Sequence, residues 1–349
     1  MIPAMPISPR KWTLIAVVFI AVVLSTVYSF NTIIDPFGSR SWVVEQRFKP
    51  IVKERSEKYH YIFNQQNIQK FDSLIMGSSR TMKIVPSNHP QMQKCYNFAV
   101  SMASNREKLF ILNEWLKYKK PHTLYLGVDF LNFHRDVENP DQPVEARFIQ
   151  GNEGNYLSHY ALKMAIKSLK NSIRNQPETF FESDGSINYY GDDQKIAANQ
   201  FDFSEQRYQN IARSIYKERF IDLPYVYTPK SLEYLREIKR LCDVHRIRLI
   251  VFIPPEQLEA TKMIIDNPQL NQFYQRYKRD IVALFGTVYD FSGGWEENKD
   301  QRNFYDVWHY RSVLGDKMVK KFYGENTFGT VLTQENIDSY LMHFHEKIR

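Results

Sequence analysis

An uncharged run near the amino terminus constrains this chain most. Residues 12–34 contain no Asp, Glu, Lys or Arg, and residues 12–30 are predominantly apolar. At ~1.5 Å rise per residue, a helix over that segment covers nearly all of the ~30 Å of bilayer hydrocarbon. We therefore predict a retained transmembrane helix over residues 12–30, preceded by a cytoplasmic tail at residues 1–11. A cleaved signal peptide is the alternative.

Charges next to this run predict its orientation. Arg10 and Lys11 precede it, Asp35 is the first charge after it, and Arg40 is the first base. The positive-inside rule then places the amino terminus in the cytoplasm and the body outside, in the periplasm or at the cell surface. The net charge of +7 suits phospholipid headgroups or acidic glycans. A nucleic-acid partner is not expected, because no concentrated Lys/Arg block or binding motif is present.

The cysteines give little indication of a metal site. Cys95 and Cys242 lie far apart and have no CxxC spacing or nearby metal ligand. They could pair outside the cell, although each lies in a segment predicted to belong to the core.

The rest of the chain alternates predicted strands and helices. A polar connector over residues 31–70 leads into a domain at 71–325, and a helical tail is expected at 326–349. An insertion at about 133–228, with one helix over 156–175, is long enough to form a lid or substrate wall. This alternation predicts an α/β fold with a parallel sheet. The expected strands are 72–76, 95–100, 123–130, 247–253 and 287–291, and the expected helices are 105–119, 231–245, about 257–284 and about 312–322.

Chemically suitable residues follow the ends of these strands. Ser79 comes just after the first strand, at the edge where α/β sheets usually build a site. Asp306 and His309 follow the last strand at an i,i+3 spacing, which on one helical turn lets the carboxylate face the imidazole and orient it. Each has an ordinary structural explanation as a turn or a surface pair, but together they predict a nucleophile and its base. Arg80 could line the same edge or lie at the surface.

These segments resemble the sequence blocks of SGNH (GDSL-like) hydrolases. Gly77-Ser78-Ser79 resembles the first block, residues 97–102 the second, residues 127–129 the third, and Asp306-x-x-His309 the last. The resemblance implies a flavodoxin-like three-layer α/β/α fold over about residues 70–324. It also implies Ser79, His309 and Asp306 as catalytic residues, and oxyanion or substrate contacts at Ser101, Met102 and Asp129.

Two positions depart from the family pattern. Met102 stands where a glycine is usual, although a backbone N–H donor does not need glycine. Asp129 stands at an asparagine position, and an ionised carboxylate cannot donate a hydrogen bond to an oxyanion. Asp129 is therefore expected to be protonated, turned away from the oxyanion, or used otherwise; capping a helix is a further alternative.

Similar proteins with one anchor helix take part in D-alanyl transfer to teichoic acids and in acylation of surface polysaccharides. The resemblance therefore implies a serine esterase or O-acyltransferase that acts on a cell-surface polysaccharide or a teichoic-acid-like polymer. A membrane-bound O-acyltransferase is the expected acyl donor, and no metal or organic cofactor is expected. The alternative is a non-catalytic scaffold for envelope polysaccharide biosynthesis or export. Acyl group, polymer and direction of transfer stay open.

Overall fold

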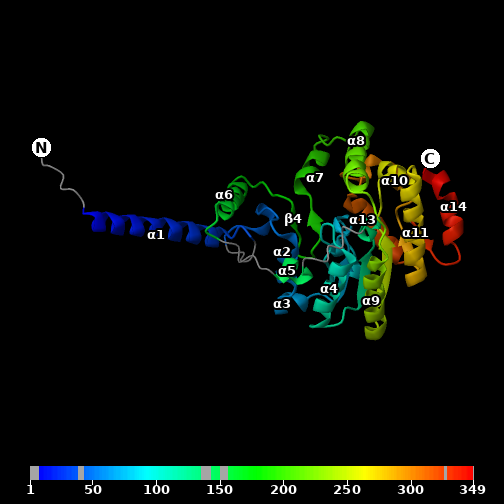
Figure 1. Cartoon of the computed structure of the whole chain (residues 1–349), viewed down its shortest axis with the longest axis horizontal. Helices are drawn as coiled ribbons and strands as arrows, with labels where there is room; N and C mark the ends of the chain where they lie inside the picture. The colour runs from blue at the N-terminus through cyan, green and yellow to red at the C-terminus, as the bar shows by residue number, and fades with distance from the viewer. Residues whose placement is uncertain (1–7, 38–42, 135–142, 150–155, 326–327, 349) are drawn as a thin grey trace.

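A six-stranded sheet organises the chain (Figure 1). The computed structural model describes residues 8–37, 43–134, 143–149, 156–325 and 328–348. Neighbouring strands in the order β2-β1-β3-β6-β7-β8 pair in parallel, except that β8 is antiparallel to β7. The strands are β1 Ser73–Met76, β2 Cys95–Asn97, β3 Thr123–Gly127, β6 Arg248–Ile253, β7 Val288–Asp290 and β8 Thr330–Leu332.

Strand order determines where a site can form. Taken in chain order, the parallel strands are arranged 2-1-3-4-5, a common doubly wound order. The order reverses between β1 and β3, and ligands of such sheets bind outside the carboxyl ends of the strands at that point. β3 is buried along its whole length, as expected of a central strand that is covered on both faces.

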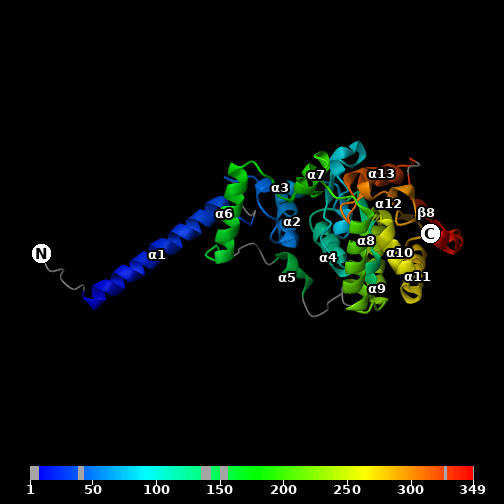
Figure 2. The same cartoon turned by 90° about the horizontal axis from the view of Figure 1, so that it is seen from above.

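Helices flank the sheet (Figures 1 and 2). Helix α4 begins with a capping box in which Ser104 and Glu107 exchange hydrogen bonds with each other's backbone N–H. The helices of the body are α2 Glu54–Ile62, α3 Gln65–Ile68, α4 Asn105–Leu116, α5 Val144–Ile149, α6 His159–Ile173, α7 Tyr190–Ala197, α8 Glu205–Tyr216, α9 Lys230–His245, α10 Leu258–Ile265, α11 Pro268–Phe285, α12 Glu296–Lys299, α13 Ser312–Phe322 and α14 Ile337–Ile348.

The elements differ from the sequence prediction at two places. The long helix expected at about 257–284 is two helices, because Asn267 caps a new helix that Pro268 begins. The carboxyl-terminal segment is not wholly helical, since β8 adds a strand to the sheet before α14. That strand has only three residues, which is too short for a clear alternation of apolar and polar positions.

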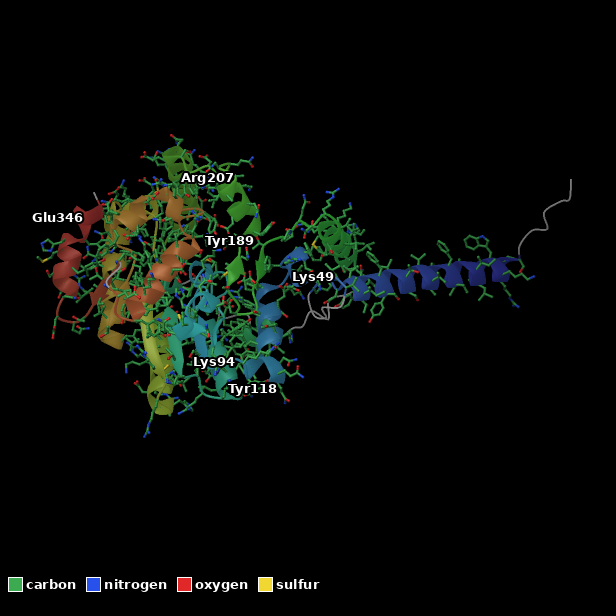
Figure 3. All side chains as sticks on the ribbon, turned by 180° about the vertical axis from the view of Figure 1, so that it is seen from behind. Lys49, Lys94, Tyr118, Tyr189, Arg207 and Glu346 are labelled. Carbon is green, nitrogen blue, oxygen red and sulfur yellow. The ribbon has the colours of Figure 1, made fainter. Side chains whose placement is uncertain are left out.

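Helix α1, Pro9–Ile34, extends away from the body (Figure 1). It is long and apolar enough to span a membrane, and within its most apolar window no residue is buried by the rest of the chain. Only its carboxyl end packs, where Ile34 joins Val44, Phe48 and Ala165 in a small apolar cluster. Lys49 lies at this junction (Figure 3) and forms a buried ion pair with Asp35 at 3.5 Å.

The elements of the insertion after β3 have different neighbours. Helix α6 packs against the carboxyl end of α1. A hairpin of β4 (Phe180–Phe181) and β5 (Ile187–Asn188) lies instead against the segments that follow β1 and β2. The Ile187 N–H donates to the carbonyl of Met82 at 3.1 Å, and the Asn97 N–H donates to the carbonyl of Asp184 at 2.7 Å. The hairpin therefore approaches the predicted site, and so does α8, whose Arg207 donates to the carbonyl of Tyr305 at 2.9 Å.

Both cysteines are buried free thiols. Burial raises the pKa of Cys95 and of Cys242, so neither is an activated thiolate. Their placement in β2 and in α9 agrees with the core segments predicted from the sequence.

Candidate active site

Ser79 lies just beyond the carboxyl end of β1, at the amino end of a 3-10 turn over Ser79–Thr81. Gly77 makes the tight exit from the strand, since a Cβ there would lie 2.2 Å from the Thr81 Oγ1. The Ser78 hydroxyl accepts the Arg80 N–H at 3.2 Å and so caps the turn. A strand followed at once by a capped turn fixes the Ser79 side chain at the edge of the sheet.

Three side chains meet there in a hydrogen-bonded relay. The Nε2 of His309 lies 2.9 Å from the Ser79 Oγ. The other ring nitrogen, Nδ1, lies 2.8 Å from Oδ2 of Asp306. The Asp306 carboxylate favours the tautomer of His309 that carries its hydrogen on Nδ1. Nε2 is then free to accept the serine proton.

The loop carrying Asp306 and His309 is not the helical turn that their spacing would also allow. It is closed by a bridge between Phe304 and Tyr310, and the Tyr305 N–H donates to the carbonyl of His309 at 2.8 Å. Asp306 Oδ1 also accepts the backbone N–H groups of Trp308 and His309. Burial raises the pKa of Asp306, but the His309 ring and these N–H groups outweigh it and lower the pKa below its usual value.

The segment after β2 lies beside the strand exit that carries Ser79. The Val100 N–H donates to the carbonyl of Gly77 at 3.1 Å. Met102 follows in the left-handed conformation, with φ at +52°. Glycine adopts this backbone conformation with less strain than a residue that carries a Cβ. Both hydrogen-bond donors of Ser101 are used within the protein: its hydroxyl donates to Glu54 at 2.8 Å, and its N–H donates to the same carboxylate.

Asp129 faces the protein interior. Its Oδ1 lies 2.9 Å from the Arg80 guanidinium, and both side chains are almost completely buried. The same guanidinium nitrogen lies 3.0 Å from Glu256. The structure thus gives Asp129 a use as an ion-pair partner of Arg80.

Arg80 connects the loops that carry the site. Besides the two carboxylates, its guanidinium donates to the carbonyls of Pro254 and Pro255 at 2.8 and 3.0 Å, just beyond β6. It also lies over the ring of Trp308, at 5.1 Å from the centroid, in the loop that carries His309. One buried cation therefore joins the ends of β1, β3 and β6 to the His309 loop. The sequence left its placement open.

Helix α2 supplies a second set of contacts, which sequence reasoning missed. Lys58 is 1% exposed, and its ammonium donates to the carbonyls of Asn97 and Ala99 at 3.0 and 2.6 Å. Arg55 donates to the carbonyl of Ser101 at 2.7 Å. Together with Glu54, these side chains hold the segment after β2, which we call the β2 loop (residues 97–102). The sequence offered only a polar, helix-prone connector.

Aromatic and basic side chains from three segments meet beside the relay. Tyr189 lies at the start of α7 (Figure 3). Its ring packs edge to face on Tyr305, with centroids 4.9 Å apart. The Lys83 ammonium lies 5.3 Å from both ring centroids. Burial raises the pKa of Tyr189, and the charges of Asp306 and Glu54 add to the rise. Tyr189 thus lies close enough to both Asp306 of the relay and Glu54 of α2 for their charges to act on its hydroxyl.

Comparison with protein-family models found no match, and no curated protein matches the chain. Within the described residues, no group of three or more His, Cys, Asp or Glu side chains is arranged to hold a metal ion. The arrangement of Ser79, His309 and Asp306 is suited to acyl transfer through a serine ester, because nucleophile, base and orienting carboxylate are in contact.

Proposed function

We propose that this chain is an SGNH hydrolase-like serine esterase or O-acyltransferase that acts on a cell-surface glycopolymer. The observation that supports this most is the relay from Ser79 through His309 to Asp306, with 2.9 and 2.8 Å between successive polar atoms. The 2-1-3-4-5 order of the parallel strands and the position of Ser79 after β1 agree with the proposed family.

The proposed reaction proceeds in two balanced steps. Ser79 Oγ attacks the acyl carbonyl carbon while His309 Nε2 takes its proton, and the leaving alcohol then receives that proton as the acyl–oxygen bond breaks. A sugar hydroxyl or water next gives its proton to His309 and attacks the acyl-serine. The acyl–Oγ bond then breaks and His309 returns the proton to the Ser79 Oγ. Asp306 stabilises the imidazolium in both steps. Backbone N–H groups at Ser79 and Met102 are the proposed oxyanion donors.

We also propose that α1 anchors the chain in a membrane, with the body on the extracytoplasmic side. The side chains of Trp12, Leu14 and Phe19 are 64–67% exposed. Large apolar side chains exposed around a helix of this length favour a lipid environment. The bases Arg10 and Lys11 support the orientation. An active cytoplasmic reporter fused to the carboxyl terminus would contradict this orientation, whereas a reporter active only outside the cytoplasm is expected.

A scaffold function is the second candidate, and the buried charges near Ser79 favour it. Arg80 faces both Asp129 and Glu256, so one cation meets two carboxylates. An excess of negative charge behind the nucleophile would disfavour an oxyanion. An enzyme must therefore place its backbone donors between the oxyanion and this cluster.

Ester hydrolysis separates the two candidates. Full-length protein in detergent is given p-nitrophenyl acetate, and Ser79→Ala and His309→Ala are compared with the wild type. Both variants should lose activity to a similar extent, because residues that act as one unit fail together. Ser339→Ala is the control, since this exposed serine lies on α14, outside the relay. Wild-type turnover in Ser79→Ala would favour the scaffold.

A further inference from the structure

Helix α6 presents an unusual exposed face. Its inner face is formed by Ala161, Ala165 and Ser168, which are buried. On the outer face, Lys163, Lys167, Lys170 and Arg174 are exposed, at spacings of four, three and four residues. Residues at such spacings lie along one side of a helix. The four bases therefore form a ridge that faces away from the body.

Apolar side chains run beside this ridge. Ile166 is 40% exposed and Ile173 is 76% exposed, and the seven-residue spacing places them on one side of the helix. Residues 156–174 contain no Asp or Glu. Lys167 is paired with Glu178 at 2.8 Å, outside the helix. A helix with bases and exposed aliphatic side chains on its outer surface is typical of helices that lie in a membrane interface.

The position of α6 relative to α1 supports the same interpretation. The segment before α6 contacts the end of α1, where the Asn31 amide donates to the carbonyl of Tyr156 at 2.6 Å. The Tyr156 hydroxyl donates to Asp35 at 3.0 Å, and its ring lies edge to face against Tyr28. In both views α6 lies across the carboxyl end of α1 and away from its middle (Figures 1 and 2).

The depth of this contact follows from helix geometry. About 20 helical residues cross the ~30 Å of hydrocarbon, so a span beginning at Trp12 ends close to Asn31. Tyr156 therefore lies at the level where α1 leaves the hydrocarbon, and α6 continues from there. Tyrosine is typical of that level.

We propose that α6 lies on the membrane that α1 spans, with Lys163 and Lys170 at anionic lipid phosphates and Ile166 in the boundary between headgroups and acyl chains. The proposal rests on the proposed anchor. An acidic polymer in solution would engage the lysines but would gain nothing from exposed Ile166 and Ile173, so a lipid surface fits the whole face better. Docking of α6 would hold the body at a fixed height above the bilayer.

Lipid quenching tests this with the full chain in vesicles of phosphatidylcholine and phosphatidylglycerol. A bimane label is attached to Ile166→Cys, to Ile20→Cys in α1, and to Val244→Cys, an exposed position on α9. The native thiols are buried and should not be labelled. Each label is read with lipids that carry a nitroxide at a shallow or at a deep position.

The shallow nitroxide should quench the label at position 166 at least about twofold more than the label at 244, because interfacial helices bury their apolar face just below the headgroups. The label at 20 should respond more to the deep nitroxide. Lys163→Glu with Lys170→Glu should reduce quenching at 166, whereas Lys230→Glu with Arg236→Glu, two exposed bases on α9, should not.

If the labels at 166 and 244 are quenched equally and weakly while the deep nitroxide strongly quenches the label at 20, the α6 proposal is overturned and the proposed anchor is kept. Absence of quenching at 20 would overturn both. Binding of soluble polyphosphate that the α6 lysine variant abolishes, without quenching at 166, would make the ridge a polymer site and would also overturn the lipid proposal.

Discussion

Replacing Arg80 by methionine should destabilise the body more than any surface change. Methionine fills the aliphatic part of the space but provides no donor and no charge. The carboxylates of Asp129 and Glu256 would then lie buried without their cation, and breaking such a buried pair costs about 3–5 kcal/mol. The carbonyls of Pro254 and Pro255 would also lose a donor, at about 1–3 kcal/mol for each unsatisfied group.

These losses overlap, so we expect Arg80→Met to reduce the free energy of unfolding by about 4 kcal/mol. Urea denaturation followed by circular dichroism measures it. Asp129→Asn should cost about 1 kcal/mol or less, because the amide oxygen can still accept from Arg80 and only one of two carboxylates is removed. Arg240→Met, on the exposed face of α9, should barely move the midpoint. A loss below about 1 kcal/mol in Arg80→Met, or equal losses in Arg80→Met and Asp129→Asn, would refute this reasoning.

Three further changes have distinct expected results. Burial lowers the pKa of Lys58 to about 7, against opposing effects of Glu54 and Asp184. Between that pH and the usual lysine value of 10.5, the unfolded chain holds a proton that the native chain has released, so stability should rise with pH over this window. Urea titrations should lose this rise in Lys58→Met; an unchanged rise would place its cause elsewhere. Met102→Gly should keep esterase activity and raise the free energy of unfolding by up to about 1 kcal/mol. A non-glycine residue in the left-handed backbone conformation costs about 1–2 kcal/mol, and the greater flexibility of glycine in the unfolded chain offsets part of this gain. A clear loss of stability would mean that the Met102 side chain packs usefully. Removal of residues 1–27 should yield a soluble body with nearly the same melting temperature, since those described residues are almost all exposed and Asn31 and Ile34 are kept; aggregation of a misfolded product would contradict it.

Local sequence patterns predicted the five parallel strands and the three residues that meet in the relay, but not the antiparallel strand β8. Short apolar runs marked the parallel strands, and Ser79 was placed by the strand directly before it. Asp306 and His309 could be paired because only three positions separate them. Their contact with Ser79 spans 230 positions and could be expected only from the strand order.

Contacts between distant segments were not predictable in the same way. Lys58 meets carbonyls about 40 positions away, and nothing near it in sequence indicates that an ammonium is buried there. For Asp129 the resemblance suggested an oxyanion or substrate contact, and its charge left open that it turns away. Its partner, Arg80, follows a different strand, β1, and could not be predicted from the residues near Asp129. A sequence block thus indicates at which strand end a residue lies. The direction of its side chain depends on charged groups that follow other strands. The break at Asn267-Pro268, by contrast, carried a recognisable capping signal.

Covalent labelling of Ser79 tests the proposed triad most directly. A fluorophosphonate reacts only with a serine whose hydroxyl is activated by a neighbouring base, and peptide mass analysis locates the adduct. The wild type should carry one adduct, on the peptide that contains Ser79. Ser79→Ala and His309→Ala should carry none, while Ser339→Ala should label as the wild type does. An adduct on another serine, or labelling that persists in His309→Ala, would contradict the proposed function.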